Sequence, residues 1–414
     1  MQQVVSPCDL KGKITVPASK SDAQRALLAA ALAKGKSTIS AIGESDDVQM
    51  MLRAIGQLGA TTEGNNQKLV VEGVQQITSE KTLMIGESGL GARLLIATAS
   101  TFKHPITIDG TGSLLQRSMA FYESVLPVLG ATIQTNNGLL PVKVRGPIKG
   151  RTIAVNGAES SQTISGLLFA LSLCEEASLL TVTNFTSQPY VQMTVKTLAA
   201  FGINIQQMDK YTFRIPGGQV FQATNYAVES DWSAASYWLV AAAIGHPITI
   251  AGLDSNSLQA DRALLDVFTR ANIAYNWDGN DIAIDGTKRT AFEFDATDCP
   301  DLFPALVVLA LYCKGTSIIK GTNRLRNKES DRATVLVNEF SILGAHIYLE
   351  DKSMFVVGTT QLTGGKVRAH NDHRIAMSLA IAATRAAEPV EIDEAESVSK
   401  SYPQFWEHLK QLTI

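Results

Sequence analysis

The chain has 414 residues, of which 45% are hydrophobic and 18% are charged, and its formal net charge is −3. This is the composition of a soluble globular protein, and two domains are the default expectation at this length. The small negative charge excludes a general electrostatic attraction to nucleic acid or to a membrane surface. An anionic ligand must therefore be bound by a local group of basic residues.

The sequence shows no sign of secretion, of a membrane span or of a metal motif. The longest apolar stretches, LLFALSL and YWLVAAAIG, are shorter than the roughly 20 residues that span a bilayer. The N-terminal segment MQQVVSPCDLKGK lacks the apolar centre of a signal peptide. The cysteines, which form neither a CxxC pair nor a Cys/His metal spacing, are Cys8, Cys174, Cys299 and Cys313. We therefore expect a cytoplasmic protein without structural disulfides.

The predicted elements repeat six times along the chain, with a spacing of about 70 residues. In each repeat an apolar helix ends at a small residue and a short β-rich stretch follows. These stretches are GKSTIS from Gly35, KHPITI from Lys103, ASLLTV from Ala177, GHPITI from Gly245, GTSIIK from Gly315 and AEPVEI from Ala387. A further helix in each of the first five repeats stops at a residue that accepts left-handed geometry, namely Gly59, Gly130, Gly202, Asn272 and Gly344. Alternating strands follow these stops, so the repeat is a mixed helix and strand unit.

Six such repeats divide most simply into two domains of three. The sixth repeat lacks its following strands, whereas residues 3–17 look like a strand pair with no helix before it. We infer that these N-terminal strands complete the sixth repeat. One domain then contains residues 1–18 and 229–414, and the other contains residues 19–228. The expected ligand site is the cleft between the two domains.

The apolar helix of each repeat is hydrophobic on nearly every side, which is typical of a buried helix. A polar cluster stands at each helix start: SKSDAQR from Ser19, ESGLGAR from Glu87, SSQTISG from Ser160, SDWSAAS from Ser230, CPDLFPA from Cys299 and HNDHR from His370. Buried helices that point the same way direct free N–H groups and partial positive charge toward one place. This arrangement favours the binding of anions.

Helix capping is the simpler interpretation of some of these polar residues, in particular Ser230, Asp231 and Asp372. Capping does not explain the basic residues there, because a cation is unfavourable at the positive end of a helix dipole. A bound anion would offset that cost. The basic residues concerned are Lys20, Arg25, Arg93 and Arg374.

The densest charge cluster is NRLRNKESDR, from Asn323 to Arg332. Lys328, Glu329 and Arg332 share one helical face, which suits simple ion pairing on a solvated surface. The same residues also suit an anion site in which Glu329 exchanges a proton. No G-x-S-x-G elbow, Walker A loop or dinucleotide GxGxxG after a strand is present. The chemistry that fits is a reaction between anionic small molecules, with Glu329 and Asp301 available for acid–base work.

The chain closely resembles the enolpyruvyl transferase family. The matching segments follow one another along nearly the whole chain: PASKSDAQRALLAAALA, IGESGLGARLL, ESSQTISGLLFA, TSQPYVQMT, ESDWSAASYW, CPDLFPA, NKESDR, NDHRIAM and SKSYPQFW. The resemblance implies a two-domain α/β (α+β) fold, an inverse α/β barrel with three repeats in each domain and buried helices. It implies transfer of the enolpyruvyl group of phosphoenolpyruvate to the 5-hydroxyl of shikimate 3-phosphate, on the shikimate pathway to chorismate and the aromatic amino acids. Small-molecule substrates, a monomer, and no cofactor, metal, nucleic-acid or membrane partner are expected.

The resemblance also assigns residues by motif. Those expected to bind shikimate 3-phosphate are Lys20, Ser21, Arg25, Ser160, Ser161, Gln162, Ser187, Asp301 and Lys328. Those expected to bind phosphoenolpyruvate are Lys20, Gly89, Arg117, Gln162, Arg332, Arg374 and Lys400. Asp301 is expected to accept the 5-hydroxyl proton, and Glu329 or Lys20 to protonate the methylene carbon on the way to a tetrahedral intermediate. A closing cleft would exclude water during this reaction.

The chain departs from the commonest family pattern at two positions, and two alternative functions are compared with the same motifs. Glu87 and Leu90 stand where the commonest family pattern has Asn and Thr. The family branch that acts on UDP-N-acetylglucosamine typically has Asn after the first site lysine and a mobile cysteine. Here Ser21 follows Lys20, and residues 109–124 contain no cysteine. The other alternative is a non-catalytic phospho-ligand binding protein, whose mark would be the loss of Asp301, Glu329 or Lys20.

Overall fold

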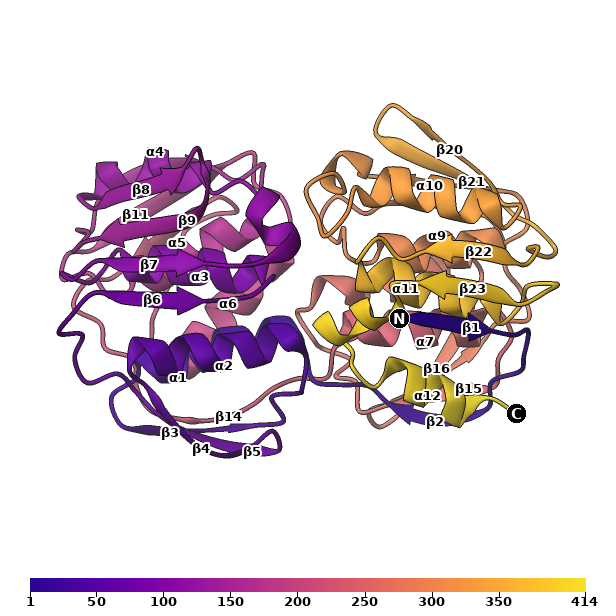
Figure 1. Ribbon diagram of the computed structural model, residues 1–414, viewed down its shortest axis with the longest axis horizontal. Coiled ribbons are helices and arrows are strands. Elements are labelled where there is room, and N and C mark those ends of the chain that lie inside the picture. Colours follow the sequence, from indigo (N-terminus) through magenta and orange to yellow (C-terminus); the bar gives the residue numbers. More distant parts are fainter. The chain divides into compact units, whose positions relative to one another are not determined.

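A computed structural model describes residues 1–414. The chain divides into two compact units, one of residues 18–228 and one of residues 1–17 together with 229–414. We call them the 18–228 unit and the 229–414 unit, and the second name includes residues 1–17. Most of their helices and strands are labelled in Figure 1.

The 18–228 unit contains the helices α1 (Lys20–Leu32), α2 (Asp46–Leu58), α3 (Gly89–Ala99), α4 (Ala120–Leu129), α5 (Ser161–Leu171) and α6 (Gln188–Ala200), and the 3-10 turn η1 (Gly112–Gln116). Its strands are β3 (Lys36–Ser40), β4 (Thr61–Asn65), β5 (Lys68–Glu72), β6 (Lys81–Met84), β7 (Ile106–Asp109), β8 (Thr132–Asn136), β9 (Leu139–Arg145), β10 (Thr152–Asn156), β11 (Ser178–Thr183), β12 (Gln206–Gln207), β13 (Thr212–Ile215) and β14 (Asn225–Ala227).

The 229–414 unit contains the helices α7 (Trp232–Ala243), α8 (Leu264–Arg270), α9 (Phe303–Leu311), α10 (Arg332–Ile342), α11 (His373–Ala383) and α12 (Phe405–Leu412), and the 3-10 turns η2 (Ala260–Ala263), η3 (Thr322–Arg324) and η4 (Ala395–Lys400). Its strands are β1 (Gln2–Val5), β2 (Gly12–Thr15), β15 (Ile248–Ala251), β16 (Ala274–Asp278), β17 (Asp281–Asp285), β18 (Glu293–Asp295), β19 (Thr316–Lys320), β20 (His346–Glu350), β21 (Ser353–Val357), β22 (Gly365–Arg368) and β23 (Val390–Asp393).

One sheet topology recurs through the chain. A parallel pair of strands is followed by an antiparallel strand and then by that strand's hairpin partner, as in β6-β7-β9-β8 and β18-β19-β21-β20. The orders β14-β3-β5-β4, β10-β11-β13-β12 and β2-β15-β17-β16 are the same, and β22-β23-β1 is a three-stranded version. These mixed sheets confirm the predicted mixed α/β class and its sixfold repeat.

The two N-terminal strands belong to different sheets. β1 pairs antiparallel with β23, with Val5 opposite Val390, and so lies in the sheet of the sixth repeat. β2 pairs parallel with β15, with Ile14 opposite Ile250, so its placement in the sixth repeat was wrong. The reason is that strands are exchanged where the chain passes from one unit to the other, at residues 17–18 and 228–229. β2 comes just before α1 but joins the sheet after α7, whereas β14 comes just before α7 but joins β3, after α1.

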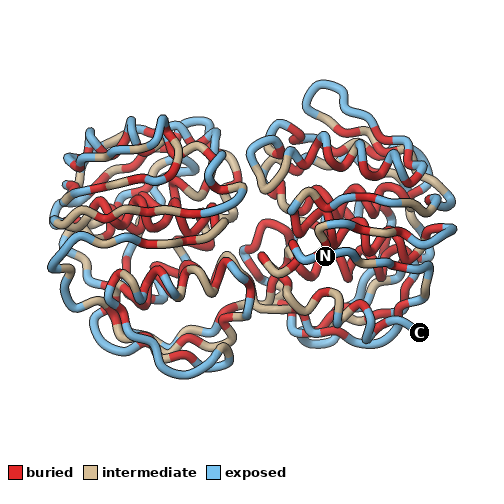
Figure 2. Tube along the Cα trace, viewed as in Figure 1, coloured by how far each residue is buried: buried red, intermediate tan, exposed pale blue.

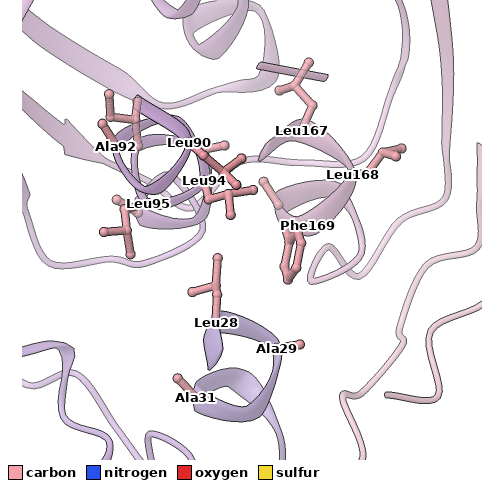
Figure 3. Close-up of a cluster of buried hydrophobic side chains, with 14 of the residues drawn as sticks. Leu28, Ala29, Ala31, Leu90, Ala92, Leu94, Leu95, Leu167, Leu168 and Phe169 are labelled. Carbon is pink, nitrogen blue, oxygen red and sulfur yellow. The ribbon is translucent and has the colours of Figure 1, made fainter. Parts of the chain in front are cut away.

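The apolar helices form the core of each unit, as predicted. Every residue of α3, α9 and α11 is buried. In the 18–228 unit the side chains of Leu28, Leu94 and Phe169 gather between α1, α3 and α5 (Figure 3). Burying each of them stabilises the fold by about 2 kcal/mol. Within each unit, exposed residues concentrate on the loops and outer strands (Figure 2).

Local signals fix where the helices begin and end. Asp231 Oδ1 accepts the N–H of Ala234 at 3.0 Å and caps α7, and Asp372 caps α11. The capping interpretation is therefore confirmed for these two residues. It is wrong for Ser230, because Asp231 occupies the N-cap position of α7 and Ser230 lies one residue before it. The predicted stops have the expected left-handed backbone, as at Gly59 with a φ of 122°. All helices fall short of the length and apolarity that a membrane span requires.

Candidate active site

Three buried helices of the 18–228 unit begin in a connected polar region. The serine before each first residue, Ser19, Ser88 or Ser160, accepts a backbone N–H from the first turn. Ser88 Oγ donates to Gln24 Oε1 at 2.7 Å and so ties α3 to α1. Arg93 Nη1 donates to Gln162 Oε1 at 3.1 Å and ties α3 to α5. The starts of these helices therefore face a common region rich in N–H groups.

Gly89, the first residue of α3, lies against two guanidinium groups. A Cβ atom at this position would be 2.7 Å from Arg117 Nη1 and 3.1 Å from Arg93 Nη1. Arg93 also donates to the carbonyl of Gly89 at 3.1 Å. The missing side chain therefore lets two cations approach a helix N-terminus, where backbone N–H groups also attract anions. The sequence predicted Gly89, Arg117 and Gln162 as site residues, and the structure brings all three together around Arg93.

Arg25 is buried among neutral oxygen atoms. Its Nε donates to Thr194 Oγ1 at 2.7 Å, and its Nη atoms donate to the carbonyls of Ser21 at 2.7 Å and Tyr190 at 3.1 Å. Burial lowers the pKa of Arg25 to about 10, although the nearby Asp22 charge opposes the shift. These three hydrogen-bond partners of Arg25 are all neutral, and its guanidinium can also donate to an anionic ligand.

Lys20 and Ser21 form the first turn of α1. The ammonium group of Lys20 pairs with Asp47 Oδ2 at 3.0 Å, and Asp47 lies in the first turn of α2. Both side chains of the pair are only slightly exposed, at 13% and 12%. Lys20 at the start of α1 is thus held by a carboxylate of α2.

The predicted serines stand at two adjoining helix starts. Ser160 caps α5, and its Oγ accepts the N–H of Gln162 at 3.2 Å. Ser161 is the first residue of α5 and is buried. Ser187 is buried directly before α6, with a left-handed φ of 54°, and α6 packs against α5. A positive φ is unusual for serine and marks a backbone held by its surroundings.

In the 229–414 unit, Arg332 joins three carboxylates. Its guanidinium donates to Asp301 Oδ1 at 2.8 Å, to Glu329 Oε2 at 2.5 Å and to Asp372 Oδ2 at 2.8 Å. The Arg332 side chain is 1% exposed and Asp372 is fully buried. Burial by itself would lower the pKa of Arg332, but the three carboxylates raise it above its ordinary value. This guanidinium is therefore the centre of an ionic network.

Asp301 lies at the edge of that network, with a side chain that is 24% exposed. Lys328 Nζ is 3.2 Å from Asp301 Oδ1, and Arg374 Nη2 is 3.3 Å from Asp301 Oδ2. Burial raises the pKa of the Asp301 carboxyl, but the three surrounding cations together hold it well below its ordinary value. Burial also lowers the pKa of Lys328, and the charge of Asp301 opposes that shift. Asp301 is therefore an ionised carboxylate that reaches solvent between cations.

Arg374 and Lys400 complete the charged group of this unit. Arg374 is the second residue of α11, and its Nη1 donates to the backbone carbonyl of Asp301 at 3.2 Å. Lys400 ends η4 and donates to the carbonyl of Asn371 at 2.8 Å, just before the residue that caps α11. Both basic side chains are buried close to the start of α11.

Three residues that make these contacts were not predicted from the sequence as site residues. Arg93 was identified at a helix start but was not included in the predicted site. Asp372 was interpreted as a cap, and its second role is to accept hydrogen bonds from Arg332 at the start of α10, 40 residues earlier in the chain. The partner of Lys20, Asp47, has no local motif. Only the tertiary packing of α1 against α2 brings the two together.

Another carboxyl group, Asp261, is buried in the same unit as Asp301. Burial raises the pKa of Asp261 to about 7, the charge of Arg374 lowers it and that of Asp301 raises it further. Ser233, in the first turn of α7, donates to one of its oxygens. No group of three or more His, Cys, Asp or Glu side chains is arranged to hold a metal ion.

Comparisons with known proteins identify the family of the chain. The family model described as EPSP synthase (3-phosphoshikimate 1-carboxyvinyltransferase) matches residues 4–409. A 3-phosphoshikimate 1-carboxyvinyltransferase of Clostridium kluyveri is 35% identical over 410 residues, which cover 99% of this chain and 96% of that protein. The enzyme of the same name from Clostridium acetobutylicum is 37% identical over 414 residues, with coverages of 99% and 96%.

A solved structure of EPSP synthase from Acinetobacter baumannii has a similar fold. It superposes with a TM-score of 0.84 at 28% sequence identity, and the match covers 100% of this chain and 98% of that one. Agreement in sequence and in fold therefore extends over the full length of the chain. The chain belongs to the EPSP synthase family.

Proposed function

We propose that the residues described above make this chain an enzyme that transfers the enolpyruvyl group of phosphoenolpyruvate to the 5-hydroxyl of shikimate 3-phosphate. Phosphate is released, and the product is 5-enolpyruvylshikimate 3-phosphate. Membership of the EPSP synthase family along residues 4–409 establishes the reaction and its place in the shikimate pathway. The structural observation that best supports the assignment of residues is the Asp301 carboxylate, held ionised among Lys328, Arg332 and Arg374.

Asp301 is proposed as the group that accepts the 5-hydroxyl proton. In the free chain its pKa is low because of the cations around it, so it would be a weak base. An anionic substrate bound to Arg374 or Lys328 would neutralise part of that positive charge. The pKa of Asp301 would then rise, and the carboxylate would become a stronger base only when the substrate is present.

The methylene carbon of phosphoenolpyruvate must gain a proton before the hydroxyl adds to the neighbouring carbon. Glu329 and Lys20 are the two proposed donors. Glu329 is bonded to Arg332 at 2.5 Å, and Lys20 is paired with Asp47 at 3.0 Å. Elimination of phosphate from the tetrahedral intermediate reverses this transfer, so the donor must also act as a base.

Anion binding is proposed to divide among the remaining cations and hydroxyl groups. The residues assigned to phosphoenolpyruvate are Lys20, Gly89, Arg117, Gln162, Arg332, Arg374 and Lys400. Those assigned to shikimate 3-phosphate are Lys20, Ser21, Arg25, Ser160, Ser161, Gln162, Ser187, Asp301 and Lys328. Guanidinium groups suit this task because they offer several N–H donors in one plane to phosphate and carboxylate oxygens.

The two compact units are proposed to act as the two domains of the enzyme, with boundaries at residues 1–18 plus 229–414 and 19–228. The residues proposed to bind phosphoenolpyruvate occur in both units, for example Gly89 in the 18–228 unit and Arg374 in the 229–414 unit. We further propose that the enzyme is a cytoplasmic monomer that needs no cofactor, since its own cations supply the positive charge that stabilises the reacting anions.

Phosphate release by the purified chain tests the assignment. Phosphoenolpyruvate is supplied with shikimate 3-phosphate, with UDP-N-acetylglucosamine, or alone. We expect stoichiometric phosphate release with shikimate 3-phosphate only. Turnover with the nucleotide sugar alone would overturn the choice of acceptor, and tight binding of both shikimate-pathway substrates without turnover would identify a non-catalytic binding protein.

A further inference from the structure

Glu87 places a negative charge two residues before Gly89, next to a region that we assign to an anion. The residue lies between β6 and the Ser88 cap of α3, and it is partly exposed. A carboxylate in such a place would repel an anionic substrate unless it holds neighbouring cations in position. The contacts of Glu87 show what it does there.

The Glu87 carboxylate holds the first residues of the η1 turn. Its Oε2 accepts the backbone N–H of Ser113 at 2.9 Å and the Ser113 hydroxyl at 2.8 Å. A Cβ atom added to Gly112 would lie 2.4 Å from the Glu87 carboxyl carbon, so the carboxylate packs directly on that glycine. Gly112 also has a positive φ of 57°, a backbone conformation that suits glycine. The turn is thus shaped around the carboxylate.

The same turn carries Arg117. The residue caps the C-terminal end of η1, and its backbone N–H bonds to the Leu114 carbonyl at 3.1 Å. Its Nη2 donates to Ser113 Oγ at 3.4 Å. An ionised carboxylate can only accept hydrogen bonds, so the Ser113 hydroxyl proton must point to Glu87. The lone pairs of that hydroxyl oxygen are then left for the Arg117 guanidinium.

From these contacts we infer that Glu87 is a positioning residue for Arg117. The carboxylate fixes the Ser113 hydroxyl and the η1 turn. The η1 turn then holds the Arg117 guanidinium against Gly89 at the start of α3. The inference rests on the proposed role of Arg117 in binding phosphoenolpyruvate. According to the inference, binding of phosphoenolpyruvate depends on the Glu87 carboxylate, although this carboxylate does not itself contact the substrate.

Steady-state kinetics of Glu87→Gln, Glu87→Ala and Ser113→Ala test the inference. Glu87→Gln keeps the shape and one acceptor, and Glu87→Ala removes both. We expect the KM for phosphoenolpyruvate to rise about 3-fold to 10-fold in Glu87→Gln and about 10-fold to 100-fold in Glu87→Ala. The KM for shikimate 3-phosphate should change less than twofold. Ser113→Ala should resemble Glu87→Gln.

Glu123→Gln is the matched control, because Glu123 in α4 also accepts a bond from a hydroxyl, that of Thr135, but lies on an exposed surface. It should leave both KM values unchanged. A merely structural role for Glu87 predicts a lower melting temperature with both KM values raised together, and that result would overturn the inference.

The Arg117→Ala background gives the sharpest readout. If Glu87 acts through Arg117, adding Glu87→Ala to Arg117→Ala should raise the KM for phosphoenolpyruvate no further. Additive effects of the two changes would contradict the inference. Calorimetric titration of phosphoenolpyruvate in the presence of shikimate 3-phosphate measures the same coupling without turnover. Inactivity of the wild-type chain would instead count against the proposed function.

Discussion

Arg25 in α1 and Arg332 in α10 are both almost completely buried, but their hydrogen-bond partners differ in kind. Arg25 donates to one hydroxyl and two backbone carbonyls. Arg332 donates to three carboxylates. The first cation has no carboxylate among these hydrogen-bond partners, whereas the second shares its charge with three carboxylates of its own chain.

The contrast extends to the two units. Around Gly89, the guanidinium of Arg93 bonds to the carbonyls of Gly89 and Ser118 and to the amide oxygen of Gln162. Around Asp301, cations and carboxylates alternate in one network. The cation beside Gly89 is therefore held by neutral groups, whereas the network around Asp301 holds an ionised carboxylate among cations.

The largest expected effect is on turnover in Asp301→Asn. The amide keeps the shape of the carboxylate but cannot accept the hydroxyl proton, so phosphate release should fall about 10²-fold to 10⁴-fold. Asp295→Asn, at an exposed position in the same unit, should keep normal turnover. A decrease of less than threefold in Asp301→Asn would remove this residue from the chemical step.

Replacing Arg332 by Met should destabilise the fold strongly. The substitution leaves Asp301, Glu329 and Asp372 without their shared cation, and removing one partner of a buried ionic group costs about 3–5 kcal/mol. Equilibrium unfolding in urea measures the change in the free energy of unfolding. A loss below about 1 kcal/mol would show that the network is less important to the fold than its geometry indicates.

Acid should weaken the 229–414 unit through His246. Its Nδ1 accepts the N–H of Leu10 at 3.1 Å, and burial together with the Arg385 charge lowers its pKa to about 3. The unfolded chain therefore binds more protons between about pH 6.5 and pH 3. The contribution of this group to stability is complete above pH 6.5 and decreases as the pH falls, by about 2 kcal/mol at pH 5.

The His246→Asn variant isolates this effect, because Asp261 shifts stability in the opposite direction. The raised pKa of Asp261, about 7, makes its contribution grow as the pH falls from 7 toward its ordinary range. Unfolding curves of wild type and variant from pH 7 to pH 5 should converge as the pH falls. Parallel pH profiles for the two proteins would contradict the assignment to His246.

The smallest expected effect on stability is that of Arg25→Met. Its partners are neutral, so their loss should cost about 1–2 kcal/mol, partly offset by removing a buried charge. Replacement by Met should thus lower the free energy of unfolding slightly at Arg25 and strongly at Arg332, although both arginines are almost completely buried. Equal destabilisation by Arg25→Met and Arg332→Met, measured in one urea series, would contradict the contrast between the two regions.

Much of this architecture follows from local sequence signals. The sixfold repeat, the buried helices, the caps at Asp231 and Asp372 and the left-handed stop at Gly59 each depend on a few neighbouring residues. The sheet that receives β2 was not predictable in this way. Strands of similar apolar pattern can pair with any open sheet edge. The edge that β2 joins is decided by the exchange of β2 and β14 where the chain passes between the units.

The candidate site shows the same division. Lys20 and Arg374 stand out in the sequence because a cation is unfavourable at a helix start, whereas Gly89 was assigned by its motif. The pairings of Lys20 with Asp47 and of Arg332 with Asp372 join different helices, and no local pattern marks them. Packing of the helices brings these groups together, so only the three-dimensional structure reveals which cations are already neutralised.

The most direct test of the division between recognition and chemistry is calorimetric titration of shikimate 3-phosphate into Arg25→Met and Asp301→Asn. We expect Arg25→Met to lose at least about tenfold in affinity, as expected when a charged hydrogen-bond donor to an anion is removed. Asp301→Asn should bind within about threefold of wild type, because an amide can still accept a hydrogen bond from the substrate hydroxyl. Normal binding by Arg25→Met together with lost binding by Asp301→Asn would contradict the assignment of these roles.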